Sequence, residues 1–217
     1  DYLSMAAYLK MPMDQDMVLR PRDLLLAHRE VLSQCGGREK GLRVVEIANK
    51  FPRVEAVLAS IKEKYEYVGK TFSIVVPEKI EQIIEEGQAL KHCLDRSDRY
   101  FERIANQESY IVFLRRTKAM EQPYYTLEIE PDGTTRQKRT VGDNQNNDYH
   151  RAEKFLKKWQ AAIRPRLSQE DFERQEISRQ LRMYELESLR NDKVTVHGGI
   201  HAGELLADIL EADLMEA

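Results

Sequence analysis

The spacing of apolar residues changes near residue 65, and this change constrains the fold more than any other feature. Before it, apolar residues recur three and four positions apart, which predicts a series of helices. After it, three runs have the composition and alternation of strands: SYIVFLRR, PYYTLEIE and TTRQKRTV. The segment EPDGT separates the last two runs, and its Asp132-Gly133 pair favours a tight turn. The three runs therefore predict a β-meander.

A hairpin around Gly69 is predicted to join this sheet, because YEYVGKTFSIVVP is also rich in β-branched and aromatic residues. Amphipathic segments such as PEKIEQIIEEGQAL and DYHRAEKFLKKWQAAIRPR predict helices around the sheet. The predicted fold class is α+β: a helical N-terminal part, a central antiparallel β-meander packed with helices, and a helical C-terminal arm. The regions expected for these parts are 1–64, 65–164 and 165–217.

The composition excludes several classes of protein. With 41 % apolar and 33 % charged residues, it is typical of a soluble globular chain. No apolar run approaches the ~20 residues that span a bilayer, and the first residues do not resemble a signal peptide. Two cysteines are too few for a disulfide scaffold, so a reduced, cytoplasmic setting without a membrane partner is expected. The chain begins without Met, which suggests a piece of a longer protein.

Several motifs in a fixed order resemble a known family. The motifs are EEGQALKHCL, YFERIANQESYIVFLRR, PYYTLEIEPDGTTRQKR and FLKKW. Together they resemble the PcfJ-like domain, and the terminal segments DYLSMAAYL and LLADILEADLME resemble the flanks of its larger members. The resemblance implies an accessory protein encoded with plasmid, phage or conjugation genes, and it implies no particular activity. One departure is HCLDRSDRY, because glycine or valine is expected after the His-Cys pair.

The break after EEGQALK places His92 beside Cys93. Adjacent residues of a helix point in different directions, so the two are not expected to act on each other. Cys93 is expected to pack in the core, as cysteines commonly do. Two interpretations of His92 stay open: its ring caps the end of a helix, or it faces a pocket.

Basic and aromatic residues gather on the predicted strands. Pairing of the cations with Glu128 and Glu130 would explain them without a function. Alternatively they form a patch that binds phosphates and stacks bases, although a net charge of -3 and a pI near 6.0 allow only a local patch. Under the leading hypothesis the protein binds nucleic acid or a protein partner. The candidate nucleic-acid-binding residues are Arg115, Arg116, Tyr124, Arg136, Lys138 and Arg139.

The alternative is an enzyme with a pocket between the helix end and the sheet, formed by His92, Tyr110, Glu128 and Gln137. This set loosely resembles the His–Tyr–acid layout of ADP-ribosyltransferases, which would imply a nucleotide substrate. Gln137 stands where such an enzyme often has a carboxylate. A concave site that joins His92, Glu128 and Gln137 would favour the enzyme, whereas a flat basic face would favour nucleic-acid binding.

No cofactor or metal is expected. The chain has no phosphate-binding loop and no dinucleotide fingerprint. His197 and His201 are four positions apart, but Gly198-Gly199 between them argue against a helix that would align them as ligands. The loop VGDNQNNDYH is expected to cap the next helix through Asn147 or Asp148.

The tail GELLADILEADLMEA predicts an acidic helix with an apolar stripe, which must be buried against something. We expect it to dock within the same chain, on the basic helix that carries Lys154, Lys157 and Lys158. Docking on another chain is the alternative, and the sequence leaves the oligomeric state open.

Overall fold

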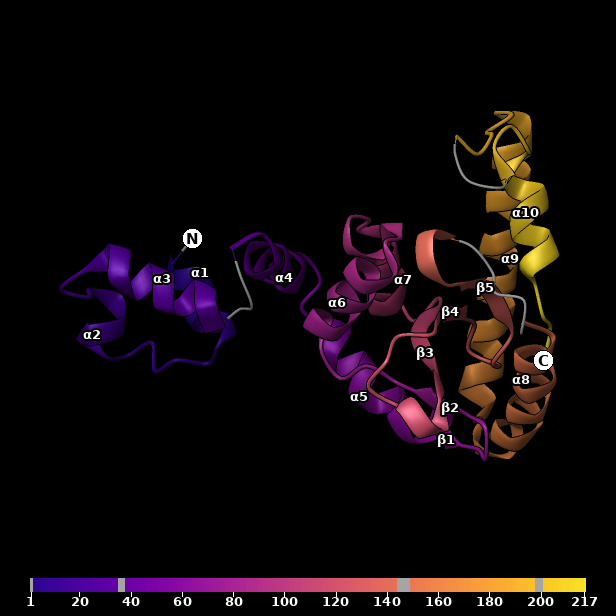
Figure 1. The fold of residues 1–217 in the computed structure, drawn as a ribbon, viewed down its shortest axis with the longest axis horizontal. Helices are drawn as coiled ribbons and strands as arrows, with labels where there is room; N and C mark the ends of the chain where they lie inside the picture. The colour runs from indigo at the N-terminus through magenta and orange to yellow at the C-terminus, as the bar shows by residue number, and fades with distance from the viewer. Residues whose placement is uncertain (1, 35–37, 144–148, 198–200) are drawn as a thin grey trace. The chain divides into compact units, whose positions relative to one another are not determined.

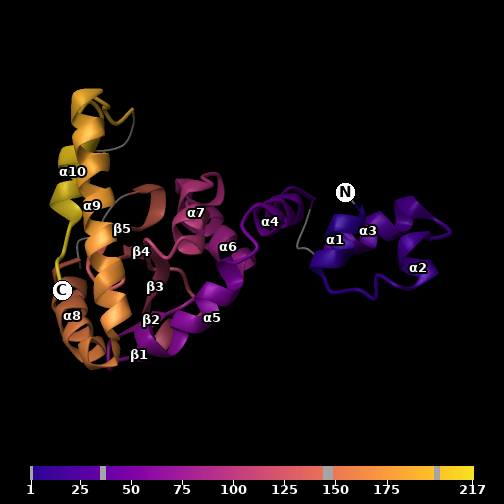
Figure 2. The same ribbon diagram turned by 180° about the vertical axis from the view of Figure 1, so that it is seen from behind.

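The computed structural model describes residues 2–34, 38–143, 149–197 and 201–217 (Figures 1 and 2). Contacts divide the chain into two compact units, Asp1–Val54 and Glu55–Ala217, called here the N-terminal and C-terminal units. The sheet shares its unit with the helix before it and with the C-terminal helices, whereas the sequence suggested three regions. The expected loop residues Asn147 and Asp148 lie outside the described residues.

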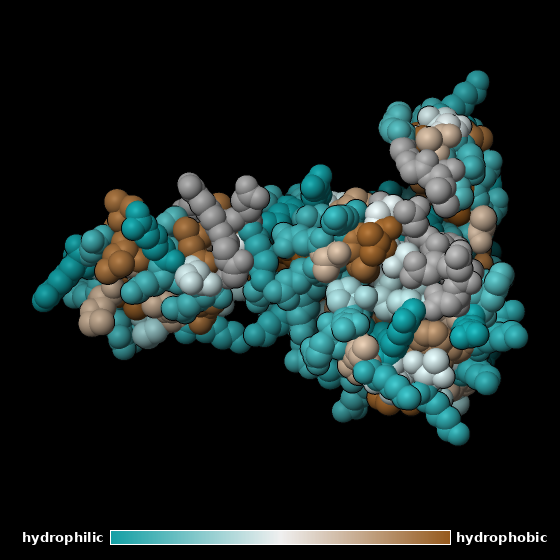
Figure 3. Space-filling model, in the orientation of Figure 1, coloured by the Kyte–Doolittle hydropathy of each residue, from teal (hydrophilic) through white to brown (hydrophobic). Residues whose placement is uncertain are grey.

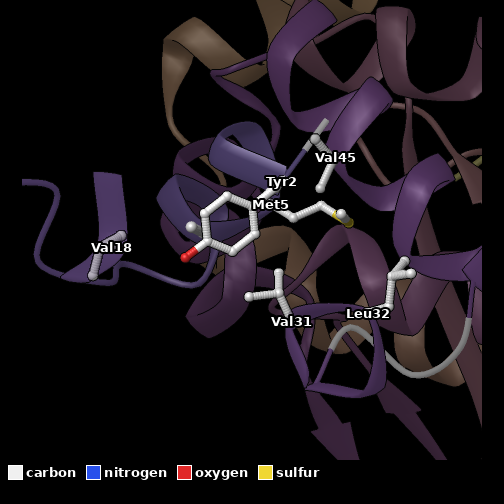
Figure 4. Close-up of a cluster of buried hydrophobic side chains, with 7 residues drawn as sticks. Tyr2, Met5, Val18, Val31, Leu32 and Val45 are labelled. Carbon is white, nitrogen blue, oxygen red and sulfur yellow. The ribbon is translucent and has the colours of Figure 1, made fainter. Parts of the chain in front are cut away.

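The N-terminal unit contains the helices α1 (Tyr2–Tyr8), α2 (Asp16–Leu19), α3 (Leu24–Gln34) and α4 (Arg38–Lys50). Its core is a cluster of buried side chains: Tyr2, Met5, Ala6, Val18, Val31, Leu32 and Val45. In Figure 4, Tyr2 and Met5 of α1 lie between Val45 of α4 and Val31 of α3. The unit also exposes apolar side chains, since Leu24, Leu25 and Leu26 are each more than half exposed. Apolar atoms are accordingly visible on the surface of this unit in Figure 3.

The C-terminal unit is built on a five-stranded antiparallel sheet whose strands follow in sequence order. The strands are β1 (Tyr67–Val68), β2 (Phe72–Val75), β3 (Tyr110–Arg116), β4 (Tyr125–Ile129) and β5 (Thr135–Arg139). The predicted α+β class, the meander and the hairpin that joins it are therefore confirmed. The register shifts between Glu128 and Ile129: Glu128 lies opposite Gln137 and Ile129 opposite Thr135, so Arg136 is an extra residue in β5.

One face of the sheet packs against α5 (Val54–Tyr65) and α8 (Tyr149–Ile163). The ring of Tyr65 lies 5.6 Å from that of Tyr110 on β3, and the indole of Trp159 donates a 2.9 Å hydrogen bond to the Tyr65 carbonyl. The buried residues of this face are Tyr110, Val112, Leu114, Tyr125, Leu127 and Ile129. They alternate with the residues of the opposite face, as the two-residue period of a strand requires.

The opposite face lies under α6 (Ile80–Leu90), the 3-10 turn η1 (Cys93–Asp95) and α7 (Arg99–Ala105). Figures 1 and 2 show α6 and α7 beside the strands. Gly87 allows η1 to approach α6, because a Cβ at this position would lie 2.7 Å from the backbone nitrogen of Asp95. The remaining short turns of this unit are η2 (Thr117–Ala119), η3 (Val141–Asp143) and η4 (Arg164–Arg166).

The C-terminal arm consists of α9 (Gln169–Asn191) and α10 (Leu206–Asp213). Ser168 begins α9 with a capping box, in which its hydroxyl accepts from the Asp171 amide and the Asp171 carboxylate accepts from the Ser168 amide. None of the helices within the described residues is long and apolar enough to cross a membrane.

The tail docks within the same chain, but its surface differs from the expected one. Asp213 pairs with Arg139 of β5 and Glu211 with Arg190 of α9, instead of the α8 lysines Lys154, Lys157 and Lys158. Beyond α10, Met215 forms two backbone hydrogen bonds with Thr135, of 2.8 and 2.9 Å. The edge of β5 explains the difference, because an edge strand offers backbone groups that a helix surface lacks.

Deletion of residues 203–217 should destabilise the protein without changing its size. The deletion removes the buried side chains of Ala207 and Ile209 and the partner of Arg139. We expect the melting temperature to fall by roughly 5 °C or more. Calorimetry and size-exclusion chromatography would measure both properties, with exposed Glu216→Gln as the control. An unchanged melting temperature, together with conversion of a dimer to a monomer, would make the tail an assembly element instead.

Candidate functional site

A pocket of about 330 Å³ lies on the sheet face that α6 and α7 cover. Its floor comes from alternate residues of three strands: Ile111, Thr126, Glu128, Gln137 and Arg139. Its walls come from the turn after α6, from α7 and from the C-terminal arm, and include His92, Cys93, Leu94, Tyr100, Glu185, Leu206, Ile209 and Leu210. The structure thus joins His92, Glu128 and Gln137 in one concave site; a catalytic role for them stays a prediction.

Glu128 is buried at the floor and accepts hydrogen bonds on both carboxylate oxygens. Oε1 accepts from Arg103 at 2.8 Å and from the Ser109 hydroxyl at 2.6 Å, and Oε2 accepts from Gln137 at 3.0 Å. Burial works to raise the pKa of Glu128, but the positive charges of Arg103 and Arg136 and these hydrogen bonds outweigh it and lower the pKa. The side chain is therefore a carboxylate at neutral pH, which can only accept hydrogen bonds.

The backbone turns sharply to bring His92 into the pocket. Lys91 ends α6 in the left-handed conformation, with φ of 55°, and His92 follows in an extended conformation. The imidazole is 8 % exposed, and its Nε2 lies 3.0 Å from the Thr126 hydroxyl. The His92 ring therefore contacts the sheet, as the pocket interpretation requires.

A short chain of polar groups positions the His92 ring. The Thr126 hydroxyl donates to Glu86 Oε1 at 3.4 Å. Glu86 in turn forms a buried, bidentate ion pair with Arg115, in which Arg115 donates a 2.8 Å hydrogen bond to Oε1. A hydroxyl that donates to Glu86 accepts from His92 Nε2, so Nε2 of the ring carries a proton in this arrangement.

Two expectations for single residues were wrong. Cys93 is exposed at the start of η1 instead of buried in the core, and its Sγ lies 3.7 Å from the Tyr100 hydroxyl. Tyr110 lies on the other face of the sheet, against Tyr65, because it is one residue out of step with Ile111 in the pocket. Tyr100 lines the pocket in its place, and no sequence signal beyond its position in the predicted helix distinguished it.

The candidate nucleic-acid-binding residues do not form an exposed basic face. Arg115, Arg136 and Lys138 are each less than 7 % exposed. Arg136 pairs with Glu130 at 2.6 Å and with Glu108 at 2.9 Å, which matches the alternative of paired charges. Arg115 pairs with Glu86, Lys138 lies 3.9 Å from Glu153, and Arg139 pairs with Asp213.

Arg116 is the exposed member of this candidate set. Its guanidinium lies 4.6 Å from the ring centroid of Tyr124, which is itself buried. Nucleic-acid binding stays a prediction. Alanine substitutions of Arg136 and Lys138 would not test it cleanly, because they would also empty buried positions.

The two histidines of the tail do not form a metal site within the described residues, which contain no suitable group of three or more His, Cys, Asp or Glu side chains. His201 lines the pocket and its Nδ1 lies 3.2 Å from Glu204, whereas His197 is exposed.

A family model described as PcfJ-like protein matches residues 1–153. The chain belongs to the PcfJ-like family. The matched range includes all the residues of the pocket floor, whereas α9 and α10, which complete the walls, lie beyond it.

The PcfJ-like chain is also similar to a protein of Listeria innocua serovar 6a that is described as uncharacterized. The two are 22 % identical over 164 residues, which are 76 % of this chain and 34 % of the relative. The matched segment thus spans about a third of the relative's length. No solved structure matches the chain.

Loss of the buried Glu86 charge should destabilise the protein far more than loss of an exposed charge. Glu86→Gln leaves Arg115 buried without its ion-pair partner, and we expect the free energy of unfolding to fall by roughly 3 kcal/mol. The matched control is Glu176→Gln on α9, which breaks an exposed pair with Arg179 and should change the stability little. Urea denaturation would compare the two; similar losses would show that burial does not govern the pair.

The stability that Glu128 contributes should depend on pH. Its folded-state pKa is below the unfolded value of about 4.3, so the contribution is present above that pH and is lost as the pH falls through the folded pKa. Ser109→Ala removes a hydrogen bond to the carboxylate and should cost roughly 2 kcal/mol at pH 7.

The difference between wild type and Ser109→Ala should shrink in acid, where Glu128 becomes protonated. Unfolding free energies at several pH values between 7 and 3 would measure it. The control is Ser188→Ala, which removes an exposed hydrogen bond to Asp192. A loss that already shrinks well above the unfolded pKa of about 4.3 would contradict the low folded-state pKa of Glu128.

Proposed function

We propose that this PcfJ-like chain binds a small ligand with a flat heterocyclic ring, such as a nucleobase, in the pocket on its sheet. The observation that supports this most directly is the concave site in which His92, Glu128 and Gln137 meet. Its volume is at the lower end of the range for small-molecule sites, about 300–1,000 Å³.

The distribution of polar and apolar groups suits a ring with a polar edge. The floor offers the hydroxyl of Thr126 and the amide of Gln137, while aliphatic side chains form much of the remaining lining: Leu94, Ile111, Val196, Leu206, Ile209 and Leu210. Such a ring buries its faces against apolar walls and directs the donors and acceptors of its edge to the polar floor.

The chemistry of the floor supports binding more than acid–base catalysis by Glu128. Its carboxylate already accepts from Arg103, Ser109 and Gln137, and its low pKa opposes proton uptake at neutral pH. The position of Tyr110 on the opposite face also removes one residue of the His–Tyr–acid layout. Other titratable lining groups, among them His92, His201 and the Tyr100 hydroxyl, are available for proton transfer, should the ligand be a substrate.

A role with plasmid, phage or conjugation genes is a further part of the proposal. Membership of the PcfJ-like family supports it. The ligand site proposed for this chain does not depend on that role, and a test of the site needs only the chain itself.

Ligand binding should raise the melting temperature and protect Cys93, which is exposed and lines the pocket. The probes are adenosine, inosine, uridine and nicotinamide at millimolar concentration. Alkylation of Cys93 by iodoacetamide with and without each probe, followed by mass spectrometry, would report occupancy.

A pair of variants would locate the site. Leu210→Trp fills the pocket and should abolish both effects, whereas Leu181→Trp adds the same side chain at an exposed position of α9 and should retain them. If none of the probes raised the melting temperature or slowed the alkylation of Cys93, the proposal would be rejected.

A further inference from the structure

The side-chain amide of Gln137 has a fixed orientation at the floor of the pocket. Gln137 lies directly opposite Glu128 in the register of β4 and β5, and its Nε2 donates to Glu128 Oε2 at 3.0 Å. The reverse orientation would place the amide oxygen against a carboxylate. Two acceptors cannot share a hydrogen bond, so the ionised Glu128 keeps the NH₂ group turned toward itself.

The charge of Glu128 is itself secured by groups outside the pocket. Arg103 and Ser109 bind its Oε1, and Arg136 lies 3.6 Å from the same oxygen. These groups keep the carboxylate ionised, and the low pKa agrees with this arrangement. The orientation of the Gln137 amide therefore does not depend on a bound ligand.

The fixed amide presents its oxygen as an acceptor for a ligand. Among the described residues, the hydrogen bond of the Gln137 side chain is the one from Nε2 to Glu128. Its Oε1 is thus an oriented acceptor on a residue that lines the pocket. An acceptor that cannot rotate favours a ligand with an N–H group and penalises one that offers an acceptor or a methyl group at that point.

We propose that Gln137 determines the specificity of the pocket, by selecting heterocyclic ligands that present an N–H donor to its Oε1. Glu128 acts through Gln137 as a positioning residue. This inference rests on the proposed function, because it specifies the ligand class of the same site.

Isomeric probes separate the loss of the donor from a change in size. In 5-methyluridine the methyl group is on carbon and the ring N–H is retained, whereas in 3-methyluridine the methyl group replaces that hydrogen. The isomers 2-methylinosine, which retains the ring N–H, and 1-methylinosine, which lacks it, form a second pair. Wild type should bind the N–H member of a pair roughly tenfold more tightly, as measured by titration calorimetry or ligand-observed NMR.

Gln137→Met keeps the approximate length of the side chain and removes the acceptor, so the preference should disappear. Glu128 retains Arg103 and Ser109 in this variant, so the fold should persist. The matched control is Gln180→Met, which removes an amide that donates to Glu176 at 3.0 Å on the exposed side of α9. The control should keep the wild-type preference. Loss of the preference in Gln137→Met alone would then be due to the missing acceptor and not to a general structural effect of a Gln→Met substitution.

The outcomes distinguish the role of Gln137 from the existence of the ligand site. Equal binding of both isomers by wild type, or a preference that survives in Gln137→Met, would overturn the role of Gln137 and leave the pocket as a ligand site. Absence of binding by every member of both pairs, together with a negative result for all the probes above, would overturn the proposed function itself.

Discussion

A buried network of charged side chains, centred on Glu128, determines how the parts of the C-terminal unit fit together. Arg103 of α7 and Arg136 of β5 lie beside this carboxylate. Both arginines also contact α9, Arg103 through Glu185 and Arg136 through Ser178. Removal of charges from water costs free energy that only close pairing offsets. The helix, the sheet and α9 are therefore constrained to the arrangement in which these charges keep their partners.

The pocket lies between this network and a second one, formed by Glu86 and Arg115. Both networks hold the side chains of the pocket floor in fixed positions. On one side of the floor, Glu128 orients Gln137; on the other, Glu86 and Arg115 orient Thr126 and with it the ring of His92. Side chains held by charged partners keep their geometry before a ligand arrives, which lowers the entropic cost of binding. The C-terminal arm supplies apolar wall residues, so the polar and apolar surfaces of the pocket come from different parts of the chain.

The alternation of strand residues predicted the sheet. Residues two positions apart on a strand share a face, and Thr126 and Glu128 accordingly both line the pocket. Which residue of β3 shares that face depends on the register between strands, and Tyr110 proved to be one position out of step. The burial of Arg136 could not be predicted, because the cover comes from α9, about forty residues along the chain. The exposure of Cys93 follows from the turn that begins there, which the helical pattern of the preceding segment does not encode.

Residues 215–217 cover part of the edge of the sheet that β5 forms. A strand such as β5 at the end of a sheet presents a row of backbone groups that can recruit a strand from another molecule. Here Met215 pairs with the backbone of Thr135 and so occupies part of that row. The side chain of Gln160 on α8 donates to the Met215 carbonyl at 3.1 Å, and the amide of Ala217 donates to the Thr134 hydroxyl at 3.1 Å. Residues 215–217 thus cover part of the β5 edge that could otherwise pair with a strand of another molecule. Frayed ends of this chain would expose a template for aggregation even while the core remained folded.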